Sequence, residues 1–203
     1  MTAIDKFWSW FIQHESELFN LNLGQDNERD KIFDEVASEL HRVNSGLTFE
    51  FGPSGLRREF VISAGGLKRS FAAVTSLVEA APPLDRWQVI AFRPRRPLSH
   101  IVEFRGKRVD PKDVQFSLLD NRRMAGLYLF IPGFEDGNSD WKQIGYLLLD
   151  ETLGEYDVEF RLGLIKMFSS DAAETLERHP LIQLPELFDS VVARLEGSVG
   201  KPS

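Results

Sequence analysis

The sequence contains no cysteine among its 203 residues. This absence excludes disulfide bonds, thiolate metal sites and a thiol nucleophile. Stability must therefore come from an ordinary hydrophobic core, and the chain has the material for one: 42% of its residues are hydrophobic, and 16 are phenylalanine.

A long apolar run is also missing. No stretch approaches the roughly 20 apolar residues that a membrane-spanning helix needs. The first residues, "MTAIDKFWSWFIQHESELF", lack the basic start and the small-residue cleavage site of a secretory signal. We therefore expect no membrane contact and a cytoplasmic location.

Motifs of metal, nucleotide and serine-hydrolase chemistry are absent as well. The four histidines are far apart in the sequence and have no metal-ligand spacing: His14, His41, His100 and His179. No G-x-S-x-G elbow is present. "ISAGGLKRSF" lacks the glycine spacing of nucleotide loops and indicates a tight strand-to-helix connection with a positive φ at Gly65 or Gly66. We predict no metal site and no cofactor.

The net charge is -7 at pH 7. Basic residues outnumber acidic ones in residues 51–110, whereas acidic residues predominate on both sides. A basic segment can bind nucleic acid, but an acidic chain repels phosphate backbones at long range. We therefore do not expect nucleic-acid binding. We expect that a partner, if there is one, is another protein. The sequence does not determine the oligomeric state.

Apolar residues recur at helical spacing in residues 4–23 and 26–43, which predicts a helical hairpin. Strands are predicted over 47–51 and 58–62, with Arg58, Phe60 and Ile62 on one face of the second. "SFAAVTSLVEAAPP" predicts a helix that stops at the prolines. "WQVIAFRP" predicts a strand at the centre of its sheet, because apolar residues lie on both of its faces.

"VQFSLL" and "AGLYLFI" predict adjacent antiparallel strands joined across "DNRRM". Apolar residues from Trp141 onward predict a helix that ends at Gly154. Residues Val158, Phe160, Leu162 and Leu164 alternate and predict a long final strand. Two short helices are predicted over residues 171–178 and 186–196.

This order of elements predicts an α+β fold, with a largely antiparallel sheet covered by helices. We expect a single domain over residues 1–196, which includes the helical hairpin of residues 1–45. A disordered tail is expected over residues 197–203.

"LLLDETLGEYDVEF", residues 147–160, gathers five carboxylates within ten positions: Asp150, Glu151, Glu155, Asp157 and Glu159. The first three are predicted at a helix C-terminus, where the helix dipole disfavours negative charge. The other two are predicted on one face of the following strand. Such a cluster can hold Mg²⁺ or Ca²⁺ or form an acid/base pair, although the order of a calcium loop is missing. Alternatively, the carboxylates face water or pair with arginines.

"FRPRRP" places Arg93, Arg95 and Arg96 directly after the strand predicted from Trp87. Arginine forms bidentate pairs with carboxylates, and the two prolines stiffen the segment. We predict that at least one of these arginines pairs with the acidic stretch. The alternative is that they clamp an anionic ligand or the acidic surface of a partner.

Trp10 lies off the apolar stripe of the first predicted helix. A large aromatic side chain in this position is a candidate for an interface. The neighbouring rings of "FWSWF" are predicted to lie in the core.

The segments "LTFEFGP", "REFVISAGG", "IAFRPRR" and "LLLDETLGEYDVEF" resemble a family of small uncharacterised bacterial proteins, a domain of unknown function. The resemblance covers most of residues 5–168. It implies a bacterial, cytoplasmic protein. None of the segments is a catalytic signature, so the resemblance assigns no active-site residue.

These observations most favour a non-enzymatic binding or protein-interaction module that acts near the arginine and acidic segments. The alternative is a metal-dependent or acid/base hydrolase-like enzyme that uses the acidic cluster at residues 150–159.

Overall fold

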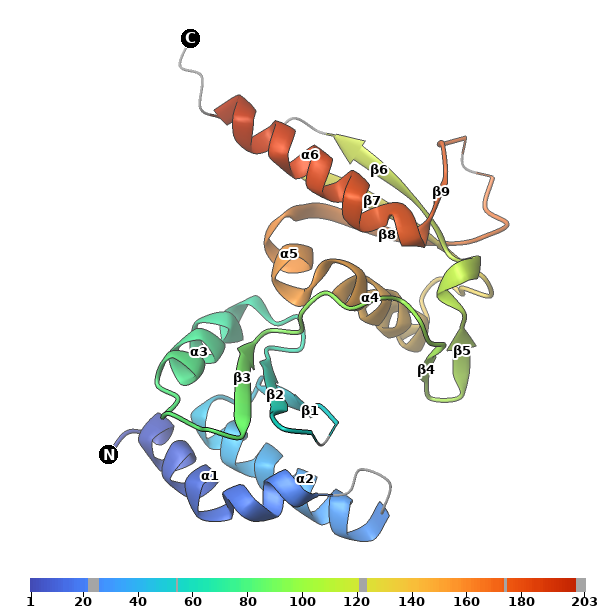
Figure 1. Cartoon of the computed structure of the whole chain (residues 1–203). Helices are drawn as coiled ribbons and strands as arrows, with labels where there is room; N and C mark the ends of the chain where they lie inside the picture. Colours follow the sequence, from blue (N-terminus) through green and yellow to red (C-terminus); the bar gives the residue numbers. More distant parts are fainter. Residues whose placement is uncertain (22–25, 54, 121–123, 174, 200–203) are drawn as a thin grey trace. The chain divides into compact units, whose positions relative to one another are not determined.

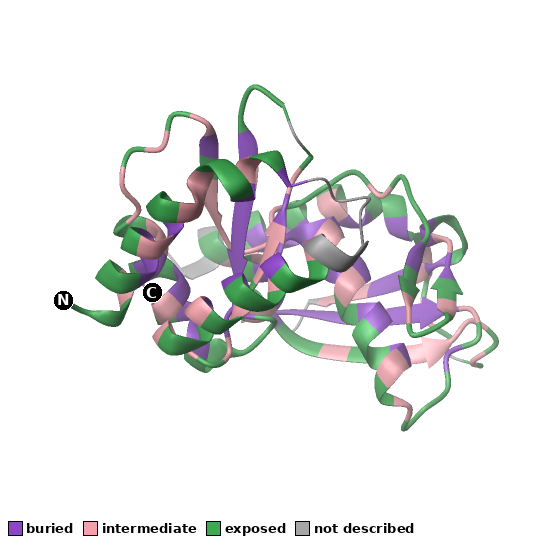
Figure 2. Cartoon of the chain, turned by 90° about the horizontal axis from the view of Figure 1, so that it is seen from below, coloured by how far each residue is buried: buried purple, intermediate pink, exposed green. Residues whose placement is uncertain are grey.

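The computed structural model describes residues 1–21, 26–53, 55–120, 124–173 and 175–199. The chain divides into two compact units, Met1–Arg93 and Pro94–Ser203, which we call the N-terminal and the C-terminal unit. Each unit has a hydrophobic core of its own. Figure 2 shows buried residues along the strands and an alternation of buried and exposed residues along the helices. The single domain over residues 1–196 stays a prediction.

The N-terminal unit is built from the first elements in Figure 1. Its described residues form α1 (Ala3–Asn20), α2 (Asp26–Val43), β1 (Thr48–Phe51), β2 (Arg58–Ser63), α3 (Lys68–Glu79) and β3 (Trp87–Ala91). The strands form one sheet in which β2 pairs antiparallel with β1 and parallel with β3. The predicted hairpin of β1 and β2 is therefore confirmed, and α3 is the crossover that a parallel pair requires.

The prediction that the strand in "WQVIAFRP" is central was wrong. β2 is the central strand of the described sheet and β3 lies at its edge. Apolar residues on both faces indicate that a strand is covered from both sides, but they do not determine which strands lie beside it. The predicted tight connection after β2 is confirmed, because Gly65 and Gly66 have φ of 56° and 74°.

The helical hairpin begins with a capping box. The backbone N–H of Asp5 donates to Thr2 Oγ1 (3.1 Å), and the backbone N–H of Thr2 donates to Asp5 Oδ2 (2.7 Å). Phe7, Trp8 and Phe11 of α1 are buried in the core, as the sequence predicted. The face of the sheet that carries Phe60 packs against them, since the rings of Phe11 and Phe60 stack at 5.1 Å.

Arg58 is fully buried in this apolar core. Its Nε donates to the carbonyl of Gly52 (2.9 Å), and its Nη1 donates to the carbonyls of Leu18 (2.8 Å), Phe19 (2.9 Å) and Leu21 (3.1 Å). The last three carbonyls belong to the C-terminal end of α1, which has no basic residue in its last turn. The guanidinium thus satisfies carbonyls that a helix end leaves without partners, and its charge suits the negative end of the helix dipole.

Aromatic rings surround this buried charge. The Arg58 Cζ lies 5.2 Å from the ring centroid of Phe51 and 5.9 Å from that of Trp87. Burial lowers the pKa of Arg58, because desolvation disfavours the charged form. Arg58 therefore ties α1 to β2 from inside the core, on the face that it shares with Phe60 and Ile62.

The C-terminal unit contains the remaining elements. Its described residues form β4 (Val102–Phe104), β5 (Lys107–Val109), a 3-10 turn (Pro111–Asp113), β6 (Gln115–Asp120), β7 (Ala125–Ile131), α4 (Ser139–Leu153), α5 (Glu155–Phe160), β8 (Leu162–Ser169), β9 (His179–Pro180), a second 3-10 turn (Leu181–Gln183) and α6 (Leu184–Val199). One sheet has the order β8-β7-β6-β9, and β4 and β5 form a separate hairpin.

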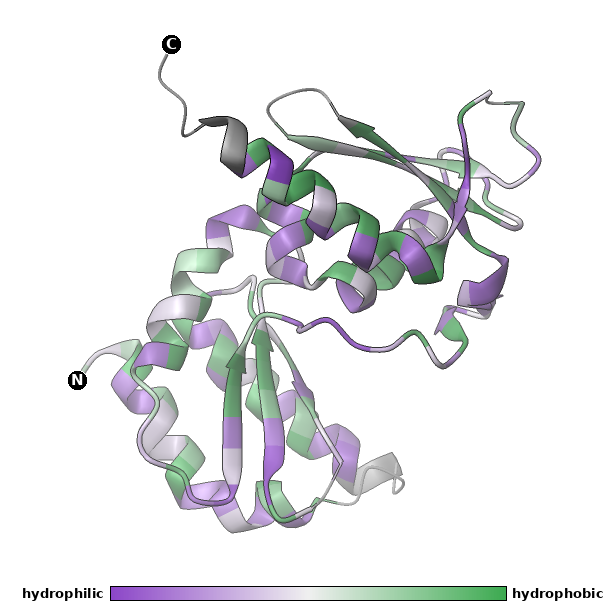
Figure 3. Ribbon diagram, turned by 45° about the horizontal axis from the view of Figure 1, so that its top comes forward, coloured by the Kyte–Doolittle hydropathy of each residue, from purple (hydrophilic) through white to green (hydrophobic). Residues whose placement is uncertain are grey.

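Helices α4 and α6 cover one face of this sheet. Leu127 and Leu129 of β7 share a core with Leu148 of α4 and Phe188 of α6. In Figure 3, α6 alternates between hydrophobic and hydrophilic residues, as expected for a helix with one buried side. In both units an antiparallel strand pair is followed by a helical crossover to a parallel third strand.

The predicted pairing of "VQFSLL" with "AGLYLFI" is confirmed. β6 and β7 are antiparallel, with Phe116 opposite Leu129 and Leu118 opposite Leu127. Residues 121–123 of the predicted turn lie outside the described residues. The predicted end of α4 is also confirmed, because Gly154 follows the helix with a φ of 84°.

The prediction of a long strand from Val158 was wrong for Val158 and Phe160. Residues Glu155–Phe160 form α5, and β8 begins only at Leu162. Gly154 allows this, because its positive φ ends α4 and lets a new helix start at the next residue. Glu155, predicted at a helix C-terminus, and Asp157, predicted on a strand, consequently lie in the first turn of a helix, where the dipole favours negative charge.

A β-bulge at the start of β8 interrupts the alternation that was predicted through Leu162 and Leu164. The register with β7 steps from Ala125–Leu162 to Gly126–Leu164, which leaves Gly163 without a partner position. The extra residue turns the side chains after it to the opposite face. Leu162 is therefore buried, whereas Leu164 is 40% exposed.

The helix predicted over residues 171–178 does not form in the described residues of that segment. The Arg178 guanidinium instead donates to the carbonyls of Ser170 (2.7 Å) and Ala172 (2.5 Å), and its Cζ lies 3.8 Å from the ring centroid of Phe130. The helix predicted over residues 186–196 is α6, which reaches Val199. Residues 197–199 of the predicted tail are thus helical, and residues 200–203 lie outside the described residues.

The fold is α+β with mostly antiparallel strand pairs, as predicted. No helix in the described part of the chain has both the length and the apolar character that crossing a membrane requires.

Replacing Arg58 with methionine should strongly destabilise the N-terminal unit. The change leaves several buried carbonyls without donors, and each unsatisfied buried group costs about 1–3 kcal/mol. We expect a loss of about 3 kcal/mol or more in the free energy of unfolding, measured by urea unfolding followed by tryptophan fluorescence. Lys6→Met on the exposed side of α1 is the control, with an expected change within about 0.5 kcal/mol. Equal effects of the two changes would contradict a role for Arg58 in the core.

Candidate functional site

The three arginines of "FRPRRP" are divided between the two units. β3 ends at Ala91, and Phe92 turns the chain with a left-handed φ of 65°. Arg93 then forms an ion pair with Glu50 of β1, inside the N-terminal unit. Arg95 and Arg96 belong to the C-terminal unit. That these arginines clamp an anionic ligand stays a prediction.

Arg95 is the centre of an ion-pair cluster. Its Nη2 lies 2.7 Å from Asp157 Oδ2, and its two terminal nitrogens donate to both carboxylate oxygens of Asp189 (2.9 and 2.8 Å). Its Nε donates to the carbonyl of Leu153 (2.7 Å). The hydrogen bonds that Arg95 donates to Asp189 raise the pKa of the guanidinium most, burial opposes this rise, and the hydrogen bond to Asp157 adds to it.

The cluster continues through Arg161. Its Nη1 lies 3.3 Å from Asp157, and its Nη2 lies 3.4 Å from Glu196 of α6. The prediction that an arginine of "FRPRRP" pairs with the acidic stretch is confirmed by Arg95 and Asp157. The sequence did not indicate Asp189 or Glu196 as partners of these arginines. Asp189 lies 94 positions after Arg95 and meets it only because α6 packs against this part of the unit, which no local sequence pattern predicts.

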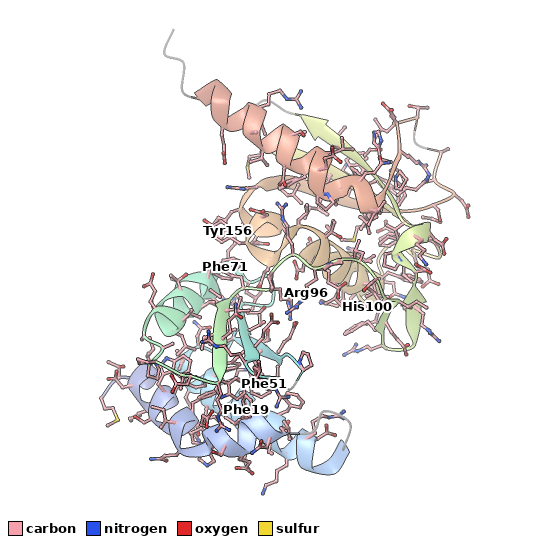
Figure 4. All side chains as sticks on the ribbon, in the orientation of Figure 1. Phe19, Phe51, Phe71, Arg96, His100 and Tyr156 are labelled. Atoms are coloured by element: carbon pink, nitrogen blue, oxygen red, sulfur yellow. The ribbon has the colours of Figure 1, made fainter. Side chains whose placement is uncertain are left out.

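The other acidic residues do not gather at one point. Asp150 and Glu155 are buried, and Glu159 is half-buried. Glu151 Oε1 lies 3.2 Å from His100 Nε2, and its carbonyl accepts from the backbone N–H of Arg96 (2.7 Å). Arg96 and His100 are labelled in Figure 4 on the segment that leads to β4. Within the part of the chain that the structure describes, no group of three or more His, Cys, Asp or Glu side chains is placed to hold a metal ion.

A different feature of the C-terminal unit has the geometry of a binding site. β8 lies at one edge of its sheet, and β7 is its only hydrogen-bonded neighbour among the described strands. A groove of about 600 Å³ lies beside β8. It is lined by Phe134, Asp136, Lys142, Tyr146 and residues 165–169. Helix α4 is therefore one wall of the groove and the edge of β8 is the other.

The two faces of β8 differ in chemistry. Ile165 and Met167 point toward the core that the strand shares with α4. Lys166 and Phe168 point to the opposite face, where the Lys166 Nζ lies 5.4 Å from the ring centroid of Tyr128. Gly145 of α4 allows the close approach, because a Cβ there would lie 2.4 Å from the Met167 sulfur.

Tyr146 stands on the helical wall and is 41% exposed. Burial raises the pKa of its phenol, and the negative charges of Glu159 and Asp150 raise it further. The phenol is a hydrogen-bonding group on the helical wall of the groove. No local sequence pattern indicates this groove, because only the tertiary fold places α4 beside the edge of β8.

Trp10 belongs to the N-terminal unit. It is half-buried, and its ring stacks on that of His14 at 4.8 Å. It lines a second groove of about 430 Å³ together with charged residues of α2, namely Lys31, Asp34, Glu35, Glu39 and Arg42. Its role at an interface stays a prediction.

Comparison of the chain with models of protein families, with curated proteins and with solved structures gives no match.

The Arg95–Asp157 pair should show a measurable coupling in a double-mutant cycle. Asp157 is 17% exposed and Arg95 is 33% exposed, so solvent screens their attraction only partly. Arg95→Met, Asp157→Asn and the double variant should give a coupling of about 1 kcal/mol in urea unfolding. The same cycle with the more exposed Asp189 should give less, a few tenths of a kcal/mol. A coupling of zero in both cycles would show that the cluster contributes nothing to stability.

Asp189 should make stability depend on pH in the acid range. Hydrogen bonds from Arg95 lower the pKa of Asp189, and the charges of Arg95 and Arg161 add to this against a partial desolvation. A carboxyl with a lowered folded-state pKa stabilises the fold above its unfolded pKa of about 3.9. This contribution is lost as the pH falls through the folded-state pKa. An NMR titration should show the Asp189 pKa below about 3.9 in the natural chain and returned toward that value in Arg95→Met; an unchanged pKa would contradict the pairing.

Proposed function

We propose that this chain is a non-enzymatic protein-interaction module of the bacterial cytoplasm, which binds an extended peptide segment of another protein along β8. The observation that carries the proposal is the combination of an edge strand and an adjoining groove. An edge strand presents N–H and C=O groups without strand partners, and an added strand can pair with them. The groove beside it can receive alternate side chains of that strand, which provides specificity.

The surroundings of the groove support this use. Four of the exposed large hydrophobic side chains belong to α4, α5 and β8: Tyr146, Tyr156, Phe160 and Leu164. Tyr156 and Phe160 stack at 4.9 Å on α5, where Figure 4 labels Tyr156. Exposed apolar groups close to an open strand edge favour an interaction site.

The acidic stretch gives less support to the alternative of a hydrolase-like enzyme. Asp157 pairs with Arg95 and Arg161, and Glu155 is fully buried. An acid/base pair needs two carboxyl groups that face a common space where a substrate can lie. The groove is lined by one carboxylate, Asp136, which lies outside this stretch.

Selection of peptides from a random display library on the immobilised chain tests the proposal. The selected peptides should protect alternate backbone amides of β8 from hydrogen exchange, because only the outward N–H groups of a strand pair with an added strand. Leu164→Glu should weaken these peptides at least about tenfold, which corresponds to about 1.4 kcal/mol.

Ile182→Glu is the matched control, since Ile182 is 69% exposed and lies on the 3-10 turn before α6. It should leave peptide affinity unchanged. Peptides that bind both variants equally, or that leave the amides of β8 unprotected, would refute strand addition at this edge.

A further inference from the structure

The groove beside β8 carries two lysines that have no ionic partner among the residues that the structure describes. Lys142 on α4 and Lys166 on β8 are exposed and line the groove. Neither forms an ion pair within the described residues, whereas Arg95, Arg105, Arg108 and Arg161 of the same unit do. Asp136 is the acidic residue among the lining residues. The groove thus has two basic groups for one acidic group, in a chain with a net charge of -7.

The alternation of β8 determines what an added strand would meet. Side chains of a strand point alternately to the two faces of its sheet. On one face an added strand lies beside Ile165, Met167 and the wall that carries Tyr146. On the other face it lies beside Lys166, whose ammonium group is already held over the ring of Tyr128. An apolar side chain suits the first face and a carboxylate suits the second.

A second copy of this chain fits the same edge poorly. Two β8 strands that pair about a two-fold axis present the same residues to each other. Lys166 is the one charged residue of β8, so the symmetric pairing brings like charges together on one face of the sheet. Like charges across a strand pair are destabilising, and an edge lysine is a common guard against such self-association.

We propose that the segment bound at β8 is an extended stretch of a partner protein in which apolar and acidic residues alternate. This inference depends on the function proposed above. The apolar residues enter the groove between Met167 and Tyr146, and the acidic residues pair with Lys166 on the open face. Lys142 attracts a further carboxylate at the helical wall.

Three synthetic ten-residue peptides with blocked ends test this inference. Valine alternates with glutamate in the first, with glutamine in the second and with lysine in the third. Binding is measured by fluorescence anisotropy at low salt, and β8 amide protection is measured in parallel. The glutamate peptide should bind at least tenfold more tightly than the lysine peptide, and salt should reduce the difference because it screens exposed charges.

Lys166→Glu should reverse the preference, and Lys142→Glu should reduce it. The control is Lys112→Glu, an exposed lysine on the 3-10 turn before β6, which should leave the preference unchanged. Circular dichroism melting of each variant establishes that it is folded. Lys166→Gln is the milder variant, and it should remove the preference without reversing it.

The outcomes separate the two proposals. Equal binding of the three peptides with protected β8 amides, or an unchanged preference in Lys166→Glu, would overturn the acidic segment and leave strand addition standing. No binding and no protection by any of the three peptides would overturn both. A dimer in light scattering that Leu164→Glu dissociates would identify a second copy as the occupant and overturn the inference.

Discussion

The parallel pairing of β8 with β7 is the constraint on which the C-terminal unit depends. Parallel neighbours cannot be joined by a tight turn, so the chain must leave the sheet and return through α4 and α5. That return places α4 beside β8, and Gly145 lets the two approach closely at Met167. The groove lies between this helix and the unpaired edge of β8.

The ion-pair cluster around Arg95 has a structural role that complements this arrangement. It connects the segment after Pro94 to α5 through Asp157 and to α6 through Asp189. Because α5 leads into β8, the cluster holds the start of the edge strand in place. Arg95 and Asp157, which belong to the charged segments most evident in the sequence, thus pair with each other within the fold. Lys142 and Lys166, which no motif distinguishes, are the charges that the fold leaves available at a groove.

In the N-terminal unit, Arg58 satisfies backbone carbonyls at the buried end of α1. A helix end inside a core has carbonyls that need donors, and a guanidinium can serve several of them at once. Its position was readable from the sequence, since Arg58 shares the face of Phe60 and Ile62. Its partners were not, because Leu18, Phe19 and Leu21 lie about 40 positions earlier and meet it only when α1 packs on β2.

Local patterns by themselves determined the helices α1, α2 and α4, the hairpins β1-β2 and β6-β7, and the α+β class, because periodicity and turn residues act within a few positions. They also indicated that an arginine of residues 93–96 would meet the acidic stretch. They failed at Glu155–Phe160, where a six-residue segment fits a short helix and a strand equally well and the positive φ of Gly154 decides between them. Only the tertiary structure determined that the chain forms two units, that β2 and not β3 is central, and that β8 is left open beside α4. These features depend on which elements far apart in the sequence become neighbours. An apolar stripe shows that an element is buried, but it does not show which other element covers it.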